Sequence, residues 1–110
     1  SSPKDIIFWA SNIIVPYIET KPFHQSQSED VHDELSLRTK YELPDEGRLY
    51  KIRCTLNLEL EQALTRHFGD LLVLEPLKLR TSILEKVRIM QKRYEKLENI
   101  KSANIEFAKT

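Results

Sequence analysis

The chain has 110 residues, which is enough for one domain with a single modest core. Its apolar content of 40% and charged content of 31% are ordinary for a globular protein, and its formal net charge of zero argues against a bulk electrostatic hold on nucleic acid or membrane. No apolar run approaches the ~20 residues of a membrane span. The single cysteine, Cys54, excludes an internal disulfide, so we expect a cytoplasmic protein.

The first predicted element is a strand at residues 5–11. Ile6, Phe8 and Ala10 face one way, whereas Ile7 and Trp9 face the other. Because both faces are apolar, the strand is expected either at the centre of a sheet or under a partner. Pro16 would break a longer helix, so only a short helix is expected from about Val15. Residues 22–33 are polar and acidic, and we expect a loop there.

Residues 34–56 are predicted to form a β-hairpin. Apolar or bulky residues alternate with polar ones from Leu35 to Leu43, and again from Tyr50 to Leu56. A period of two is typical of half-buried strands. The segment between them, Pro44–Gly47, has the composition of a turn. Cys54 is then expected to be a small core residue.

Residues 57–97 predict a helix, a strand and a second, longer helix. Asn57 is a good N-cap, and Gly69 is expected to end the first helix in a left-handed conformation. The apolar run at residues 71–74 is short enough for a strand. Pro76 then opens a helix over about residues 77–97. We expect residues 1–98 to form one domain and residues 99–110 to be frayed.

The long helix carries a narrow apolar stripe. Its members follow one another in steps of four, three, four and three residues, as in a coiled coil: Ile83, Val87, Met90, Tyr94 and Leu97. We give equal weight to packing within the core and to an intermolecular seam.

The predicted order β-α-β-β-α-β-α corresponds to an α+β, ferredoxin-like sandwich with an additional long C-terminal helix. In that fold the helices cover one face of the sheet and leave the other open. The open face would carry Ile7 and Trp9, together with four basic side chains: Arg38, Lys40, Lys51 and Arg53. The strand at 71–74 would lie at an edge, where apolar side chains on both faces favour association.

Two segments resemble a known family. The pattern EL…FGD…VLEP..LR…Y within residues 57–94 is similar to the C-terminal extension that follows the WYL domain in bacterial helix-turn-helix transcription regulators. The segment PFHQSQ, with Pro22, His24, Ser26 and Gln27, resembles a P-x-H-x-S-Q segment of these extensions. The resemblance implies the same ferredoxin-like fold. It also implies that the WYL and DNA-binding domains of the regulator lie outside this chain, so that DNA is contacted only through the missing domain.

No residues suggest a catalytic or metal site or a cofactor. His24 and Ser26 are close in sequence, but no acid is marked to orient the histidine, so we do not expect an enzyme. The PFHQSQ segment is expected to fix its loop through side-chain to backbone bonds, or alternatively to contact the WYL domain.

The leading hypothesis is a regulatory domain that forms homodimers and transmits effector sensing to the DNA-binding heads. The expected interface combines the sheet and the long helix: Ile7, Trp9, Leu72, Leu74, Met90 and Tyr94. The alternative is a binding module that takes an anionic ligand or single-stranded nucleic acid on the four basic residues of the open face. RNA-binding sheets of this kind stack bases on aromatic side chains, and here only Trp9 could do so.

Overall fold

The computed structural model describes the backbone of residues 2–109 and the side chains of residues 2–100. The chain divides into two compact units, Ser1–Arg80 and Thr81–Thr110. The first contains a three-stranded antiparallel sheet with three short α-helices, and the second is formed by most of one long helix. The protein is therefore α+β, as expected. In the described part of the chain no helix is long and apolar enough to cross a membrane.

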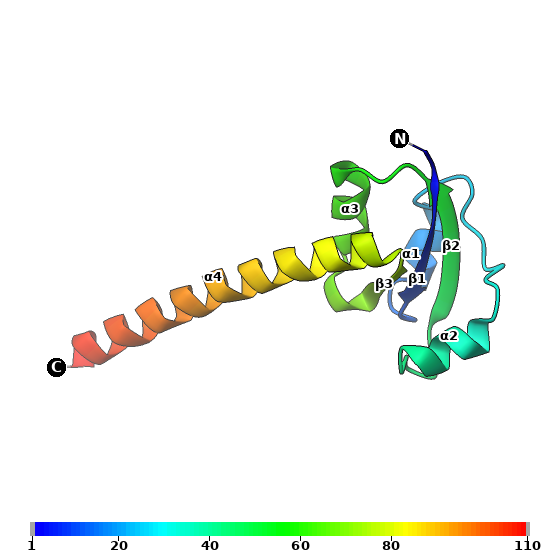
Figure 1. Ribbon diagram of the computed structural model, residues 1–110. Helices are drawn as coiled ribbons and strands as arrows, with labels where there is room; N and C mark the ends of the chain where they lie inside the picture. The colour runs from blue at the N-terminus through cyan, green and yellow to red at the C-terminus, as the bar shows by residue number, and fades with distance from the viewer. Residues whose placement is uncertain (1, 110) are drawn as a thin grey trace. The chain divides into compact units, whose positions relative to one another are not determined.

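The sheet has β1 (Lys4–Ala10) at its centre, between β2 (Arg48–Cys54) and β3 (Leu71–Glu75) (Figure 1). β1 pairs with β2 along its whole length, from Lys4 opposite Cys54 to Ala10 opposite Arg48. Its pairing with β3 is interrupted by a register shift between Ile7 and Phe8. The central position confirms the prediction that β1 is a central strand. A strand with apolar residues on both faces is expected where both of its faces are covered.

On one face of the sheet Tyr50 of β2 bonds to Glu19 of α1 (Val15–Thr20), and α3 (Leu58–Thr65) contacts β3. Phe8 lies at the centre of this layer, stacked on Tyr50 with 5.4 Å between ring centroids, and it meets Phe23 edge-on at 5.5 Å. Ile18 of α1 and Leu64 of α3 are fully buried as well. The short helix expected near Val15 is confirmed.

The other face of the sheet is covered as well, which contradicts the expected open face. Trp9, Leu49 and Leu74 are buried there as one cluster. The chain from Val31 to Leu43 packs against that cluster. Trp9 is only 5% exposed, and its indole N–H donates a hydrogen bond of 3.0 Å to the carbonyl of Glu46.

The reason is that residues 34–40, expected as a strand, form the helix α2 (Glu34–Lys40). Leu37 and Tyr41 are four residues apart, so they share one side of the helix and both contact the Trp9 cluster. Leu35, which a strand would place on the same face as Leu37, is 80% exposed. The predicted hairpin is therefore wrong in its first half and correct in its second, β2.

The segment after β2 follows the prediction except at its glycine. The Oδ1 atom of Asn57 accepts a 2.8 Å hydrogen bond from the amide of Leu60, which confirms the N-cap of α3. The helix ends at Thr65, and a short 3₁₀ turn, η1 (Phe68–Asp70), follows. Phe68 (φ 53°), and not Gly69, takes the left-handed conformation. β3 lies at the sheet edge, as expected.

The last helix, α4 (Leu77–Lys109), begins directly after Pro76, as expected. Leu79, in its first turn, is buried. The backbone remains helical through Lys109, so α4 includes most of the segment that we expected to be frayed. The second unit is thus helical along its described length.

Candidate functional site

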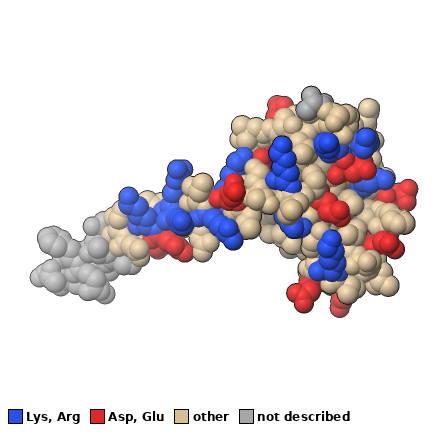
Figure 2. All heavy atoms as spheres, viewed as in Figure 1, with Lys and Arg blue, Asp and Glu red and all other residues tan. Residues whose placement is uncertain are grey.

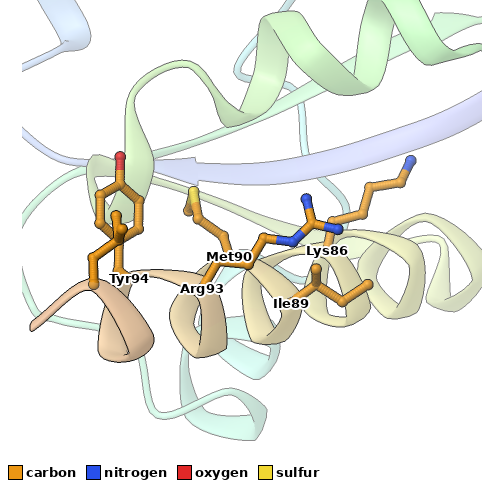
Figure 3. Close-up of a pocket in the computed structure, with 6 residues that line it drawn as sticks. Lys86, Ile89, Met90, Arg93 and Tyr94 are labelled. Carbon is orange, nitrogen blue, oxygen red and sulfur yellow. The ribbon is translucent and has the colours of Figure 1, made fainter. Parts of the chain in front are cut away.

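The apolar stripe of α4 is the main exposed apolar feature of the second unit. Val87 is 42% exposed, Met90 41%, Tyr94 64% and Leu97 58%. These values are far from those of a core, where side chains of this size are nearly inaccessible. Figure 3 shows Met90 and Tyr94 standing on the same side of the helix, as residues four positions apart must. The stripe therefore offers a continuous apolar surface to a partner.

Charged side chains flank this stripe. A shallow groove runs along it, lined by Lys86, Ile89, Met90, Arg93, Tyr94 and Leu97. Residues 81–100 carry five Lys or Arg and three Glu, a net charge of 5 − 3 = +2. Figure 2 shows the basic side chains gathered along the described part of α4. Apolar seams bordered by charges are typical of helices that associate with other helices.

The four sheet residues of the predicted interface are less available than the sequence suggested. Trp9 and Leu74 are buried in the cluster beneath α2, and the half-buried Ile7 packs against them. Leu72 is 41% exposed. The prediction of Trp9 as an exposed interface residue is wrong, because α2 and its flanking segments occupy the face on which it lies. Of the sheet residues, Leu72 alone keeps a largely accessible side chain.

The predicted basic patch is divided between two elements. Arg38 and Lys40 lie on α2, whereas Lys51 and Arg53 lie on β2. The guanidinium of Arg38 donates hydrogen bonds to the carbonyls of Pro44 and Gly47, at 3.0 and 2.9 Å. Arg38 therefore fixes the segment that leads into β2.

The remaining basic side chains of the patch have separate surroundings. Arg53 forms a 2.9 Å ion pair with Asp5 of the neighbouring strand. The ammonium group of Lys40 lies 5.1 Å from the centre of the Tyr41 ring. Two of the four charges thus already hold the fold together, and the geometry does not favour an anion-binding sheet face.

The PFHQSQ segment is held by its own polar side chains. Nδ1 of His24 accepts a hydrogen bond from the amide of Ser26, and the hydroxyl of Ser26 lies 2.7 Å from the same nitrogen. The Ser26 hydroxyl oxygen also accepts a 2.8 Å hydrogen bond from the amide of Arg53 in β2. In this geometry the hydroxyl is occupied by structural bonds.

Gln27 anchors the same segment from the other side. Its side-chain nitrogen donates to the carbonyl of Ile18, at the end of α1, and its side-chain oxygen accepts from the amide of Phe23. Pro22 lies exposed at the start of the segment. The bonds of His24, Ser26 and Gln27 agree with the loop-fixing interpretation.

Two polar features were not anticipated from the sequence. Ser28 forms an isolated antiparallel bridge with Lys51, through hydrogen bonds of 3.0 and 2.8 Å, on the outer side of β2. The buried Tyr50 donates a 2.6 Å hydrogen bond to the carboxylate of Glu19. Burial and this hydrogen bond raise the pKa of Tyr50 to about 12. Sequence patterns give no signal for either, because both join segments more than twenty residues apart.

Comparison of the chain with protein-family models, with curated proteins and with solved structures finds no match.

Proposed function

We propose that the chain is a non-catalytic regulatory domain of a WYL-type transcription regulator, and that it forms homodimers through α4. The observation that carries the dimer is the apolar stripe, whose members from Val87 to Leu97 are 41–64% exposed. Water-exposed side chains at coiled-coil spacing gain free energy when a second helix covers them.

The topology supports the family part of the proposal. A ferredoxin-like sheet has four strands, and the described sheet has three. On the outer side of β2, where the fourth strand would pair, Ser28 forms its bridge to Lys51. The fold is thus interpreted as a ferredoxin-like sheet in which one edge strand is reduced to a single bridge, with α2 inserted after it.

The PFHQSQ segment supports the same proposal. It stands directly before this bridge, and Ser26 bonds to the backbone of β2 two residues from Lys51. The PFHQSQ segment thus fixes the position of its loop against the edge strand β2, which is a structural role within this fold. The geometry therefore agrees with the loop-fixing interpretation of this segment.

The proposed mechanism is a shift between dimer arrangements. An effector that binds the WYL domain changes the DNA-binding heads only if it favours one arrangement of the two copies over another. In this scheme α4 supplies the association, and the compact unit Ser1–Arg80 contacts the WYL domain. The effector and DNA sites themselves belong to the other domains.

Light scattering across a concentration series tests the proposal. The chain should form a dimer whose fraction grows with concentration. Met90→Glu, which places a charge in the middle of the stripe, should shift the population to monomer. Asn99→Glu is the matched control, because it adds the same charge to α4 at a position that coiled-coil spacing turns away from the stripe.

Circular dichroism must show the same helix content in both variants before their masses are compared. A strict monomer at the highest concentration, or equal effects of the two substitutions, would contradict the proposal.

A further inference from the structure

We infer that the two copies of α4 pair in parallel and in register, with Arg93 of one copy beside Glu98 of the other. This inference rests on the proposed function, because it specifies how the second copy is oriented. It is carried by the placement of charges beside the stripe, an observation separate from the exposure of the stripe itself.

The spacing of the stripe fixes the heptad positions. Val87 and Tyr94 occupy the a positions, and Ile83, Met90 and Leu97 the d positions. The flanking g positions are then Lys86 and Arg93, and the e positions Leu84, Gln91 and Glu98.

In a parallel pair each g residue lies beside the e residue five positions further along the partner helix. Arg93 therefore meets Glu98 of the second copy, and the symmetry of the dimer makes this contact twice. Lys86 meets Gln91, which is a neutral contact. The parallel arrangement thus joins opposite charges without opposing like charges at these positions.

The antiparallel arrangement places like charges beside one another. The register that keeps most of the apolar layers pairs Val87 with Leu97 and Met90 with Tyr94. Antiparallel packing brings g residues beside g residues, so Arg93 would lie beside Arg93 of the second copy. Glu98 would face the apolar Leu84. Charge complementarity therefore selects the parallel pair.

Both members of the proposed ion pair are available for it. Neither Arg93 nor Glu98 makes a side-chain hydrogen bond or ion pair with any side chain that the structure describes. By contrast Gln91, at the neighbouring e position, donates a 3.0 Å hydrogen bond to Glu95 of its own helix. A second copy of α4 would supply both Arg93 and Glu98 with an oppositely charged partner.

The orientation of the pair determines at which end of the coiled coil each copy's unit Ser1–Arg80 is attached. In a parallel pair the two copies of Thr81 lie at the same end of the coiled coil. In the antiparallel register above they would lie roughly 33 Å apart along the axis, at 1.5 Å per residue. A parallel pair therefore attaches both copies of the unit Ser1–Arg80 to the same end of the coiled coil.

Disulfide trapping tests the orientation. The native thiol is first removed with Cys54→Ala, because Cys54 is a partly exposed free cysteine. Val87→Cys and Leu97→Cys are then made separately in this background, and each variant is checked for its dimer mass under reducing conditions. Each is oxidised alone in a glutathione redox buffer, and then the two are oxidised as a mixture.

A parallel pair predicts that Leu97→Cys crosslinks efficiently by itself and that the mixture gives mainly like-with-like products. An antiparallel pair predicts weak self-crosslinking and a dominant mixed product. That result, from a chain that is dimeric by light scattering, would overturn the inference and leave the proposed function intact. A monomeric parent chain would overturn both.

A charge exchange provides a second test that needs no cysteine. Arg93→Glu alone, and Glu98→Arg alone, should each raise the dissociation constant of the dimer several-fold. The double variant should bring it back close to that of the parent chain. Two independent losses without recovery in the double variant would show that these residues do not meet.

Discussion

Replacement of Gly47 by alanine should destabilise the compact unit Ser1–Arg80 severely. Gly47 has a φ of +86°, in the region that favours glycine. A Cβ atom added there would lie 2.5 Å from Nε1 of Trp9 and 2.6 Å from the carbonyl oxygen of Ala10. The first contact opposes the hydrogen bond between Trp9 and Glu46, and the second presses on the backbone of the central strand.

The magnitude follows from these two costs. The left-handed conformation costs an alanine about 1–2 kcal/mol, and overpacking beside a rigid core costs about 1–3 kcal/mol. The lower entropy of the unfolded alanine chain returns about 0.4–1 kcal/mol. The expected net loss is about 3 kcal/mol, which lowers the melting temperature of a domain of this size by more than about 10 °C.

Gly69→Ala is the matched control, because a Cβ atom there meets nothing within 4 Å and Gly69 does not have a positive φ. This variant should be neutral or slightly stabilised. Urea unfolding followed by the fluorescence of Trp9, the chain's single tryptophan, measures both variants. Equal stabilities would refute the packing of the Pro44–Gly47 segment against Trp9. A loss in Gly69→Ala alone would restore the helix-ending role that the sequence suggested for that glycine.

Three further outcomes are expected. The phenol of Tyr50 has a pKa of about 12 in the folded chain and near 10 in the unfolded chain, so it keeps its proton to higher pH when folded. The free energy of unfolding should therefore fall as pH rises from about 10 to 12. In urea titrations across that range, Tyr50→Phe should flatten this fall. Ser26→Ala removes the acceptor for the amide of Arg53 and should cost about 1 kcal/mol, measured by thermal unfolding; an unchanged midpoint would contradict the loop-fixing role. Leu35→Asp should be tolerated and Leu37→Asp should destabilise, whereas a strand with both side chains inward would lose stability in both variants.

Local signals were sufficient for the elements that the sequence predicted well. The cap at Asn57, the proline at 76 and the apolar run at 71–74 act within a few residues of themselves, so the beginnings of α3, β3 and α4 could be placed. The stripe of α4 also depends only on spacing along one helix, which is why this part of the candidate site was identified.

The errors arose where tertiary packing decides between local alternatives. Leu37 and Tyr41 fit a strand of period two, but being four residues apart they fit one side of a helix equally well. Packing of both residues against the Trp9 cluster selects the helix. The neighbouring sequence does not indicate this contact with a strand that lies far away along the chain. The same nonlocal contact covers the sheet face that was expected to be open. It therefore buries Trp9, which was predicted to lie exposed at the interface, and it separates the four basic residues that were predicted to share that face. Phe68 illustrates the point on a smaller scale, because it adopts the left-handed conformation although a glycine follows it.

Both faces of the sheet are covered. Among the described residues, two of the surfaces predicted for self-association keep exposed apolar side chains: the stripe of α4 and the edge of β3 at Leu72. The edge offers a single largely exposed leucine beside the buried Leu74, whereas the stripe offers a row of exposed apolar side chains with charges beside it. Leu72→Asp should therefore leave the dimer mass unchanged in light scattering under conditions in which Met90→Glu abolishes it. The opposite result would place the interface on the β3 edge, and α4 would then be available to a different partner.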